Sequence, residues 1–119
     1  MPDLTRKDVI MILATTEHAR LAGVDLSGLD LRGLNFAGAD LIRANLAGAD
    51  LSHAYMRHAQ LEDAILEGTI LVNANLKEAN LKGANMKNAR LRGTLLTDAN
   101  LFKATVSQIA LSESIGASV

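Results

Sequence analysis

Residues 74–93 read ANLKEANLKGANMKNARLRG, four phrases of five residues that each begin with Ala and carry Leu or Met in third place. The spacing runs far beyond this stretch, because every fifth residue from 26 to 101 is large and apolar. These sixteen third-place residues are Leu26, Leu31, Phe36, Leu41, Leu46, Leu51, Met56, Leu61, Leu66, Leu71, Leu76, Leu81, Met86, Leu91, Leu96 and Leu101. The first place, two residues earlier, is Ala in most phrases; the exceptions are Val24, Leu29, Leu34, Thr69 and Thr94.

A repeat of five residues fits neither a helix nor a flat strand. A helix would scatter every fifth side chain around its circumference, and a strand alternates with a period of two. If each phrase is one short extended side followed by a corner, its first and third side chains point inward and the other three face water. Glycine suits a corner that needs unusual backbone angles, and it fills the fifth place at Gly28, Gly33, Gly38, Gly48, Gly68, Gly83 and Gly93.

Phrases such as AGADL, ANLAG and ANLKG resemble the pentapeptide repeat family, and the resemblance covers most of the chain. It implies an all-β solenoid, a right-handed quadrilateral β-helix with four phrases to a turn. Residues spaced by twenty then stack in adjacent turns, about 4.8 Å apart. This stacking predicts opposite-charge neighbours at Glu62/Lys82, Glu67/Lys87 and Arg43/Asp63. It also predicts inward columns such as Leu26, Leu46, Leu66 and Met86.

The ends of a solenoid expose its core and need caps. We expect an N-terminal capping segment over 1–18, the β-helix over 19–108 and a C-terminal cap or tail over 109–119. Thr5 and Asp8 have the form of a capping box, so a helix over about 6–17 is predicted, with an apolar stripe of Val9, Ile10, Leu13 and Ala14. The C-terminal segment has two alternatives: loosely fitting further coil, or a helix capped by Ser107 and stopped by Gly116.

Composition narrows the functional classes. The 119 residues form one domain, and 12 Lys plus Arg against 13 Asp plus Glu give no general nucleic-acid footprint. Without Cys there is no disulfide framework, Cys-ligated zinc site or Cys nucleophile. The longest apolar run, Val9–Ala14, is too short to span a bilayer, and no basic region precedes it. We therefore expect a soluble cytoplasmic protein with no membrane partner and no direct nucleic-acid partner.

The repeat contains no residue pattern that indicates a catalytic site. His18, His53 and His58 are expected to be solvated, since His53 and His58 occupy corners on neighbouring sides, where side chains diverge. Second-place acids such as Asp25 and Asp40 are explained by hydrogen bonds to nearby backbone. No insertion interrupts the repeat between residues 24 and 103, so no loop is available to build a concave pocket. The sequence predicts no enzyme, no cofactor and no metal.

The resemblance also raises a functional alternative, because quinolone-resistance members of the family mimic DNA and bind type II topoisomerases. A rod of about 23 Å would need on the order of thirteen negative charges to match B-DNA. Residues 24–103 carry nine acids and nine bases, a net charge of zero. Their first half, 24–63, has six acids and three bases and their second half, 64–103, the reverse. This polarity is either chance or a device that orients a partner or a second copy.

Apolar residues in outward places mark candidate contacts. Ile65 and Ile70 take the second place usual for Asp or Asn, and Val72 takes the fourth place beside Ile70, so all three should surround one corner. Such a cluster is either tolerated drift or a protein-binding patch. A second set, Leu95, Phe102, Val106 and Ile109, should pack under the C-terminal cap or in a homodimer. We interpret the chain as a non-catalytic interaction or scaffold module, monomeric or homodimeric; the topoisomerase-binding DNA mimic is the alternative.

Overall fold

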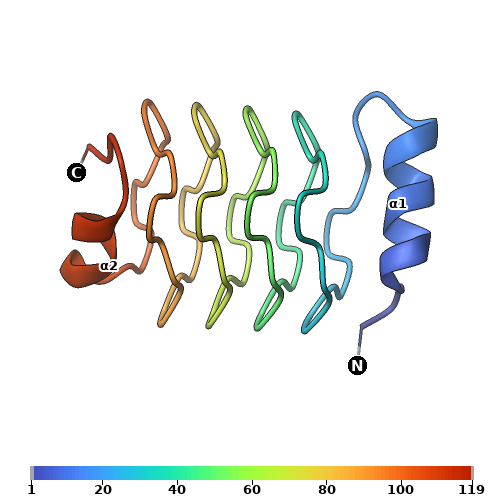
Figure 1. The fold of residues 1–119 in the computed structure, drawn as a ribbon, viewed down its shortest axis with the longest axis horizontal. Coiled ribbons are helices and arrows are strands. Elements are labelled where there is room, and N and C mark those ends of the chain that lie inside the picture. Colours follow the sequence, from blue (N-terminus) through green and yellow to red (C-terminus); the bar gives the residue numbers. More distant parts are fainter. Residues whose placement is uncertain (1, 119) are drawn as a thin grey trace.

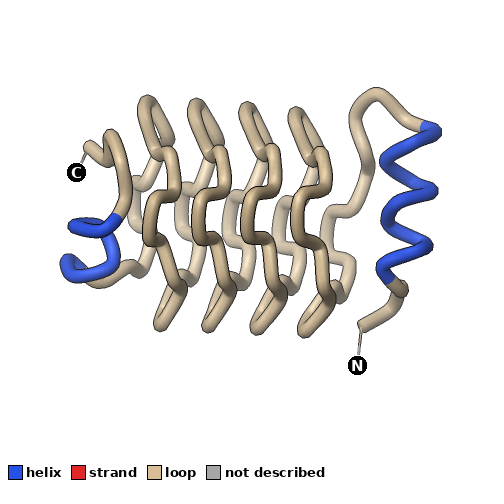
Figure 2. The backbone as a smooth tube through the Cα atoms, viewed as in Figure 1, coloured by secondary structure: helices blue, strands red, loops and turns tan. Residues whose placement is uncertain are grey.

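The computed structural model describes residues 2–118 and has the predicted fold, a right-handed quadrilateral β-helix closed by a helix at each end (Figure 1). The helices are α1, Arg6–Thr15, and α2, Gln108–Glu113. Between them the described chain forms no extended strand, only square coils joined by single parallel bridges (Figure 2). Met1 and Val119, the outer ends of the two expected terminal segments, lie outside the described residues.

Bridges connect second-place residues that are twenty positions apart, which confirms twenty residues per turn. Ile65, for example, pairs with Asn45 in one neighbouring coil and with Asn85 in the other. The Ile65 N–H donates to the Ala44 carbonyl at 2.9 Å, and the Leu66 N–H donates to the Asn85 carbonyl at 2.7 Å. Each coil therefore holds the next through main-chain hydrogen bonds on its four sides, and the coil edges are satisfied except at the ends.

Each corner is a turn that needs a left-handed residue. The Thr69 N–H donates to the Leu66 carbonyl at 3.2 Å, and Gly68 between them has φ of 67°. Positive φ at the third residue of such a turn is the type II geometry, which favours Gly and tolerates Asn. Nine non-glycine fifth-place residues also have positive φ: Arg43, His53, His58, Asp63, Asn73, Glu78, Asn88, Asp98 and Lys103. The fold thus imposes this conformation even where the residue disfavours it.

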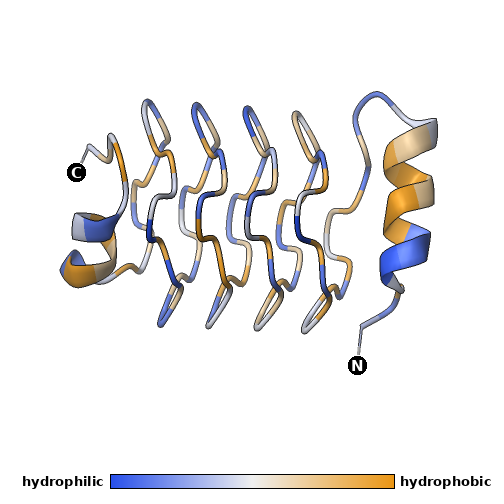
Figure 3. Cartoon of the chain, in the orientation of Figure 1, coloured by the Kyte–Doolittle hydropathy of each residue, from blue (hydrophilic) through white to orange (hydrophobic). Residues whose placement is uncertain are grey.

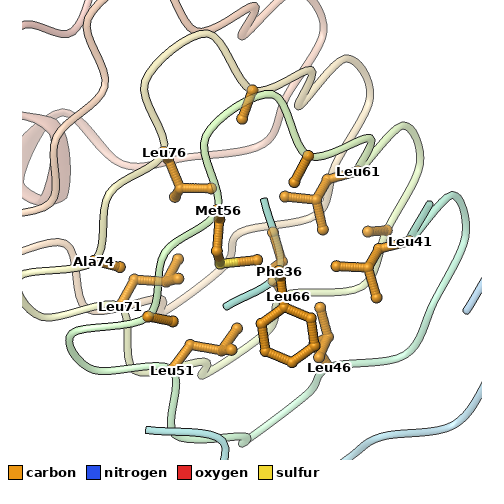
Figure 4. Packing of buried hydrophobic residues seen from close by; sticks show 14 of the residues in the cluster. Phe36, Leu41, Leu46, Leu51, Met56, Leu61, Leu66, Leu71, Ala74 and Leu76 are labelled. Atoms are coloured by element: carbon orange, nitrogen blue, oxygen red, sulfur yellow. The ribbon is translucent and has the colours of Figure 1, made fainter. Parts of the chain in front are cut away.

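The large third-place side chains meet inside the coils (Figure 4). From Leu21 through Leu96 every one of them is at most 1% exposed, and Leu101 in the last coil is partly exposed. The first-place Ala residues leave room for them. Thr69 and Thr94 are buried in the same place, and their hydroxyls donate to the carbonyls of Leu46 and Leu71 at 2.7 and 2.6 Å. The interior is therefore one continuous apolar column.

Helix α1 lies across the first coil (Figure 1). The predicted capping box is present: the Asp8 N–H donates to Thr5 Oγ1 at 3.2 Å, and the Thr5 N–H donates to the Asp8 carboxylate at 2.9 Å. The predicted apolar stripe is partly wrong, because Ile10 and Ala14 are exposed. Val9 is buried in the core instead, and partly buried Leu4, Ile12 and Leu13 pack against the same core, as do the larger first-place residues Val24, Leu29 and Leu34.

The C-terminal segment takes the helical alternative. Ser107 caps α2, because its hydroxyl accepts a hydrogen bond from the Ala110 N–H at 3.0 Å. The chain then returns to the solenoid, where Ile115 bridges Leu95. Gly116 follows with φ of 77°, just beyond the end of the helix. Both end helices carry apolar residues (Figure 3), of which Val9 in α1 and Ala110 and Leu111 in α2 are buried in the core.

The predicted charge pairs are not formed among the described residues. Ion pairs between coils join Arg57 to Glu78 at 2.6 Å and Arg32 to Asp50 at 3.9 Å. Glu62 accepts a hydrogen bond from the Asn80 amide in place of the expected neighbour Lys82. Long side chains at corners reach sideways to a neighbouring column, so stacking by twenty does not determine exposed pairing.

The interior column predicts a large cost for truncation at its centre. Replacing Leu66 by Ala should lower the free energy of unfolding by roughly 2 to 5 kcal/mol, the usual range for a buried leucine. Urea denaturation measures it. A loss below about 0.5 kcal/mol, the level of an ordinary surface substitution, would contradict the inward assignment.

The left-handed corners predict opposite effects at neighbouring corners. A Cβ at Gly48 would meet no atom within 4 Å, so Gly48→Ala tests φ alone and should destabilise by about 1 kcal/mol. Arg43→Gly should stabilise by up to about 1 kcal/mol, because Arg43 has φ of 58°. Thermal unfolding of both variants distinguishes this account from one in which the glycines are chosen for lack of space; in that case Gly48→Ala would be neutral.

Candidate functional site

Second-place polar side chains hold the backbone rather than forming a reactive site. All ten Asp and Asn residues in this place accept a hydrogen bond from the main-chain N–H two residues later, at 2.9–3.2 Å. These residues are Asp25, Asp30, Asn35, Asp40, Asn45, Asp50, Asn75, Asn80, Asn85 and Asn100. The local turn explains why a short polar side chain recurs here.

Ile65 and Ile70 depart from this rule. Neither offers an acceptor, and within residues 2–118 the N–H groups of Glu67 and Val72 have no hydrogen-bond partner. Ile65 is 38% exposed, while Ile70 and Val72 are half-buried. Ile65 and Ile70 lie on adjoining sides of one coil and Val72 begins the next corner. We call these three residues the apolar corner; it exposes less apolar surface than the sequence suggests.

The four apolar residues predicted near the C-terminal end differ in burial. Leu95 and Val106 are half-buried, and Val106 packs against the core. Phe102 is 61% exposed beneath the Lys103 ammonium, whose Nζ lies 5.4 Å from the ring centroid. Ile109 on α2 is 76% exposed. A hollow of about 610 Å³ opens beside Phe102, so α2 covers only part of the C-terminal end.

All three histidines, His18, His53 and His58, are exposed. His53 and His58 are exposed corner residues, and His58 Nε2 lies 3.3 Å from Glu78 Oε2. Arg57 beside Glu78 holds the pKa of that carboxyl below its ordinary value. In the described part of the chain no three His, Asp or Glu side chains gather as metal ligands. No helix in the same range is long and apolar enough to cross a membrane.

Asp30 is the centre of the most developed charge cluster. Arg32 binds it with Nε and Nη2, both at 2.9 Å, and Arg6 of α1 approaches it at 3.4 Å. Arg6 also donates to the Asp30 carbonyl at 2.7 Å, which ties α1 to the coil. Hydrogen bonds from the Arg32 side chain and main chain hold the pKa of Asp30 well below its ordinary value. The cluster is a structural link between cap and coil.

A hollow that the sequence does not predict, which we call the notch, has a volume of about 380 Å³ and is lined by Val72, Ala89, Arg90, Leu91, Arg92 and Glu113. It lies where α2 replaces the coil that would have covered Arg90. The signal available in the sequence was Arg in a second place shortly before the repeat breaks down. Val72 connects the notch to the apolar corner.

Comparison with known families identifies the repeat. The pentapeptide repeat profile matches with eight copies over residues 19–57, 54–93 and 79–115. A comparison with functionally curated proteins gives no significant match.

Solved structures share the architecture. A pentapeptide repeat protein of the Arabidopsis thaliana thylakoid lumen is 35% identical, with a TM-score of 0.66 over 69% of this chain and 57% of that one. One from Nostoc is 23% identical, with a TM-score of 0.67 over 96% and 97% of the two chains. A plasmid-mediated fluoroquinolone resistance protein is 16% identical, with a TM-score of 0.50 over 84% and 64%. The chain thus spans little more than half of the Arabidopsis protein, and the last two likenesses concern the fold alone.

The Asp30 cluster predicts a pH-dependent contribution to stability. Asp30→Asn keeps the turn acceptor but removes the ion pairs with Arg6 and Arg32, so it should destabilise the protein at pH 7. Because the pKa of Asp30 is lower in the folded state, its contribution is present above the unfolded pKa near 3.9 and declines as the pH falls below it. The difference in urea midpoint between wild type and variant should therefore shrink from pH 7 to pH 2.

Asp40→Asn is the matched control, because Asp40 closes the same kind of turn and makes no ion pair among the described residues. An equal, pH-independent effect of both substitutions would show that the ion pairs of Asp30 contribute nothing.

Proposed function

The chain belongs to the pentapeptide repeat family, and on that premise we propose that it is a rigid, non-catalytic protein-interaction module whose contact surface includes the apolar corner. The observation that carries this proposal is that Ile65 and Ile70 both lack the side-chain acceptor of the turn hydrogen bond. Each residue gives up a turn hydrogen bond that all ten Asp and Asn residues make in this place, and each adds apolar surface outside. A hydrogen bond of this kind contributes about 1 kcal/mol, so contact with a partner is a reason for keeping isoleucine.

Rigidity supports an interaction role. Main-chain ladders hold every coil, and the side chains inside are fully buried from Leu21 through Leu96. A surface that does not rearrange loses little conformational entropy when it binds. Polar side chains that would have to act as acid and base are instead engaged in turns or exposed at diverging corners, which supports a non-catalytic function.

Mimicry of DNA, directed at a type II topoisomerase, is the second candidate. Structural likeness to the fluoroquinolone resistance protein favours it only at the level of the fold. The charge balance opposes it, because nine bases offset the nine acids between residues 24 and 103. A DNA mimic needs a dominant negative field, so we rank it below the interaction module.

The proposal includes a cytoplasmic location and a protein partner. The Arabidopsis relative comes from the thylakoid lumen, so location does not follow from family membership. Partial coverage of the C-terminal end, with Ile109 and Phe102 exposed, is compatible with either a monomer or a homodimer.

Affinity capture from a native lysate tests the apolar corner. We expect a partner that the wild-type rod retains and a variant carrying Ile65→Asn, Ile70→Asn and Val72→Ser loses. The two Asn residues restore the turn acceptor found in ten other phrases, and Ser copies Ser52 one coil earlier, so the variant should be at least as stable as wild type. Unfolding in urea checks this before capture.

Tyr55→Asn is the matched control, because Tyr55 is an exposed second-place residue on another side of the rod. Equal capture by the wild type and the triple variant would contradict the assigned surface. A type II topoisomerase retained by both rods would favour the DNA mimic.

A further inference from the structure

At the notch, one step of the main-chain hydrogen bonding between coils is missing; we call this step the missing rung. In the coil below, Ile70 is bracketed by two hydrogen bonds to Arg90: the Arg90 N–H donates to the Thr69 carbonyl at 2.9 Å, and the Leu71 N–H donates to the Arg90 carbonyl at 2.8 Å. If the solenoid continued, the residue one coil later would make the same two hydrogen bonds to Ala89 and Leu91, the residues on either side of Arg90. The chain has left the solenoid there for α2, and the Ala110 N–H binds Ser107 instead.

Two main-chain groups in the notch are therefore unpaired. Within residues 2–118 the carbonyl of Ala89 and the N–H of Leu91 have no hydrogen-bond partner, although Leu91 is only 1% exposed. An unsatisfied polar group next to buried surface costs free energy. The pair has the spacing that accepts one residue of an extended chain, with its N–H directed to Ala89 and its carbonyl to Leu91. A free anion could satisfy the donor but not the acceptor.

The charge of the notch favours an acidic side chain in the bound segment. Neither Arg90 nor Arg92 makes an ion pair among the described residues, and a side chain placed over Arg90 would stack directly on it. Glu113 is the one acid among the lining residues, so they carry a net charge of +1, two Arg less one Glu. Arginine in such a place recognises carboxylates through two parallel hydrogen bonds.

The other open edge lacks this preference. The hollow beside Phe102 has one acid, Asp98, and one base, Lys103. Below the notch, Ile70 and Val72 supply apolar surface where a neighbouring side chain of the bound segment can rest.

We propose that the notch binds an extended acidic segment of a partner protein, one residue of which takes the missing rung above Arg90 and places its carboxylate between Arg90 and Arg92. This proposal rests on the proposed interaction function, whose apolar corner it extends. It defines the partner by its chemistry: extended backbone, acidic and apolar side chains in alternation.

Fluorescence anisotropy of the full chain tests the notch with a labelled, C-terminally amidated nonapeptide in which Asp alternates with Val. We expect saturable binding near 0.15 M salt that weakens at least about tenfold with Arg90→Gln plus Arg92→Gln, because each lost charge-assisted hydrogen bond is worth a factor of that order. Lys82→Gln plus Lys87→Gln is the matched control: it removes the same charge from other corners of the coil and should change binding less than threefold.

A second set of peptides tests the backbone contact. N-methylation of the central residues removes the N–H groups that would bind Ala89, and this should weaken binding at least fivefold. No binding at millimolar peptide, equal weakening by both double variants, or indifference to N-methylation would overturn the proposal, the last because it would mean that the arginines attract any carboxylate. If a captured partner depends on the apolar corner but not on Arg90 and Arg92, the notch fails while the interaction function stands.

Discussion

The left-handed corner is the constraint on which the whole structure depends. Every five residues one backbone unit must take positive φ, so that the chain turns by one side of a square and returns above its starting point after twenty residues. That return stacks the third-place leucines and pairs the main chains of second-place residues in adjacent coils. It also places a second-place Asp or Asn where its side chain can close the turn. Nine non-glycine residues accept this conformation, so the coils stabilise it enough to offset its local cost.

The same regularity explains where function can reside. On most sides of the rod a second-place Asp or Asn is engaged in the same turn hydrogen bond, so one side differs little from the next. Specificity must come from places where the repeat is broken. The apolar corner is one such place, since Ile65 and Ile70 each replace the usual Asp or Asn on two adjoining sides of one coil. The notch is another, since α2 interrupts the ladder above Arg90. Val72 belongs to both, so they form one continuous surface.

The fold could be predicted from the sequence because a strict period leaves one inward direction for Leu66 and its fifteen equivalents. The capping box of Thr5 and Asp8 is equally local and was also predictable. Contacts of long side chains that can reach several neighbours were not predictable: Glu62 binds Asn80 instead of Lys82, and α1 packs partly buried Ile12, instead of Ile10, against the core. The notch was hidden for a further reason, because it consists of main-chain groups exposed only when the next coil fails to form.

Amide hydrogen exchange of the rod, alone and with the partner that it captures, measures where the partner binds. We expect added protection to concentrate at the amides of Glu67, Val72 and Leu91, which have no hydrogen-bond acceptor within residues 2–118, while the coils around Leu31 exchange unchanged. Protection confined to α1 or to the acidic first half would contradict the proposal, because it would place the interaction surface away from both the apolar corner and the notch.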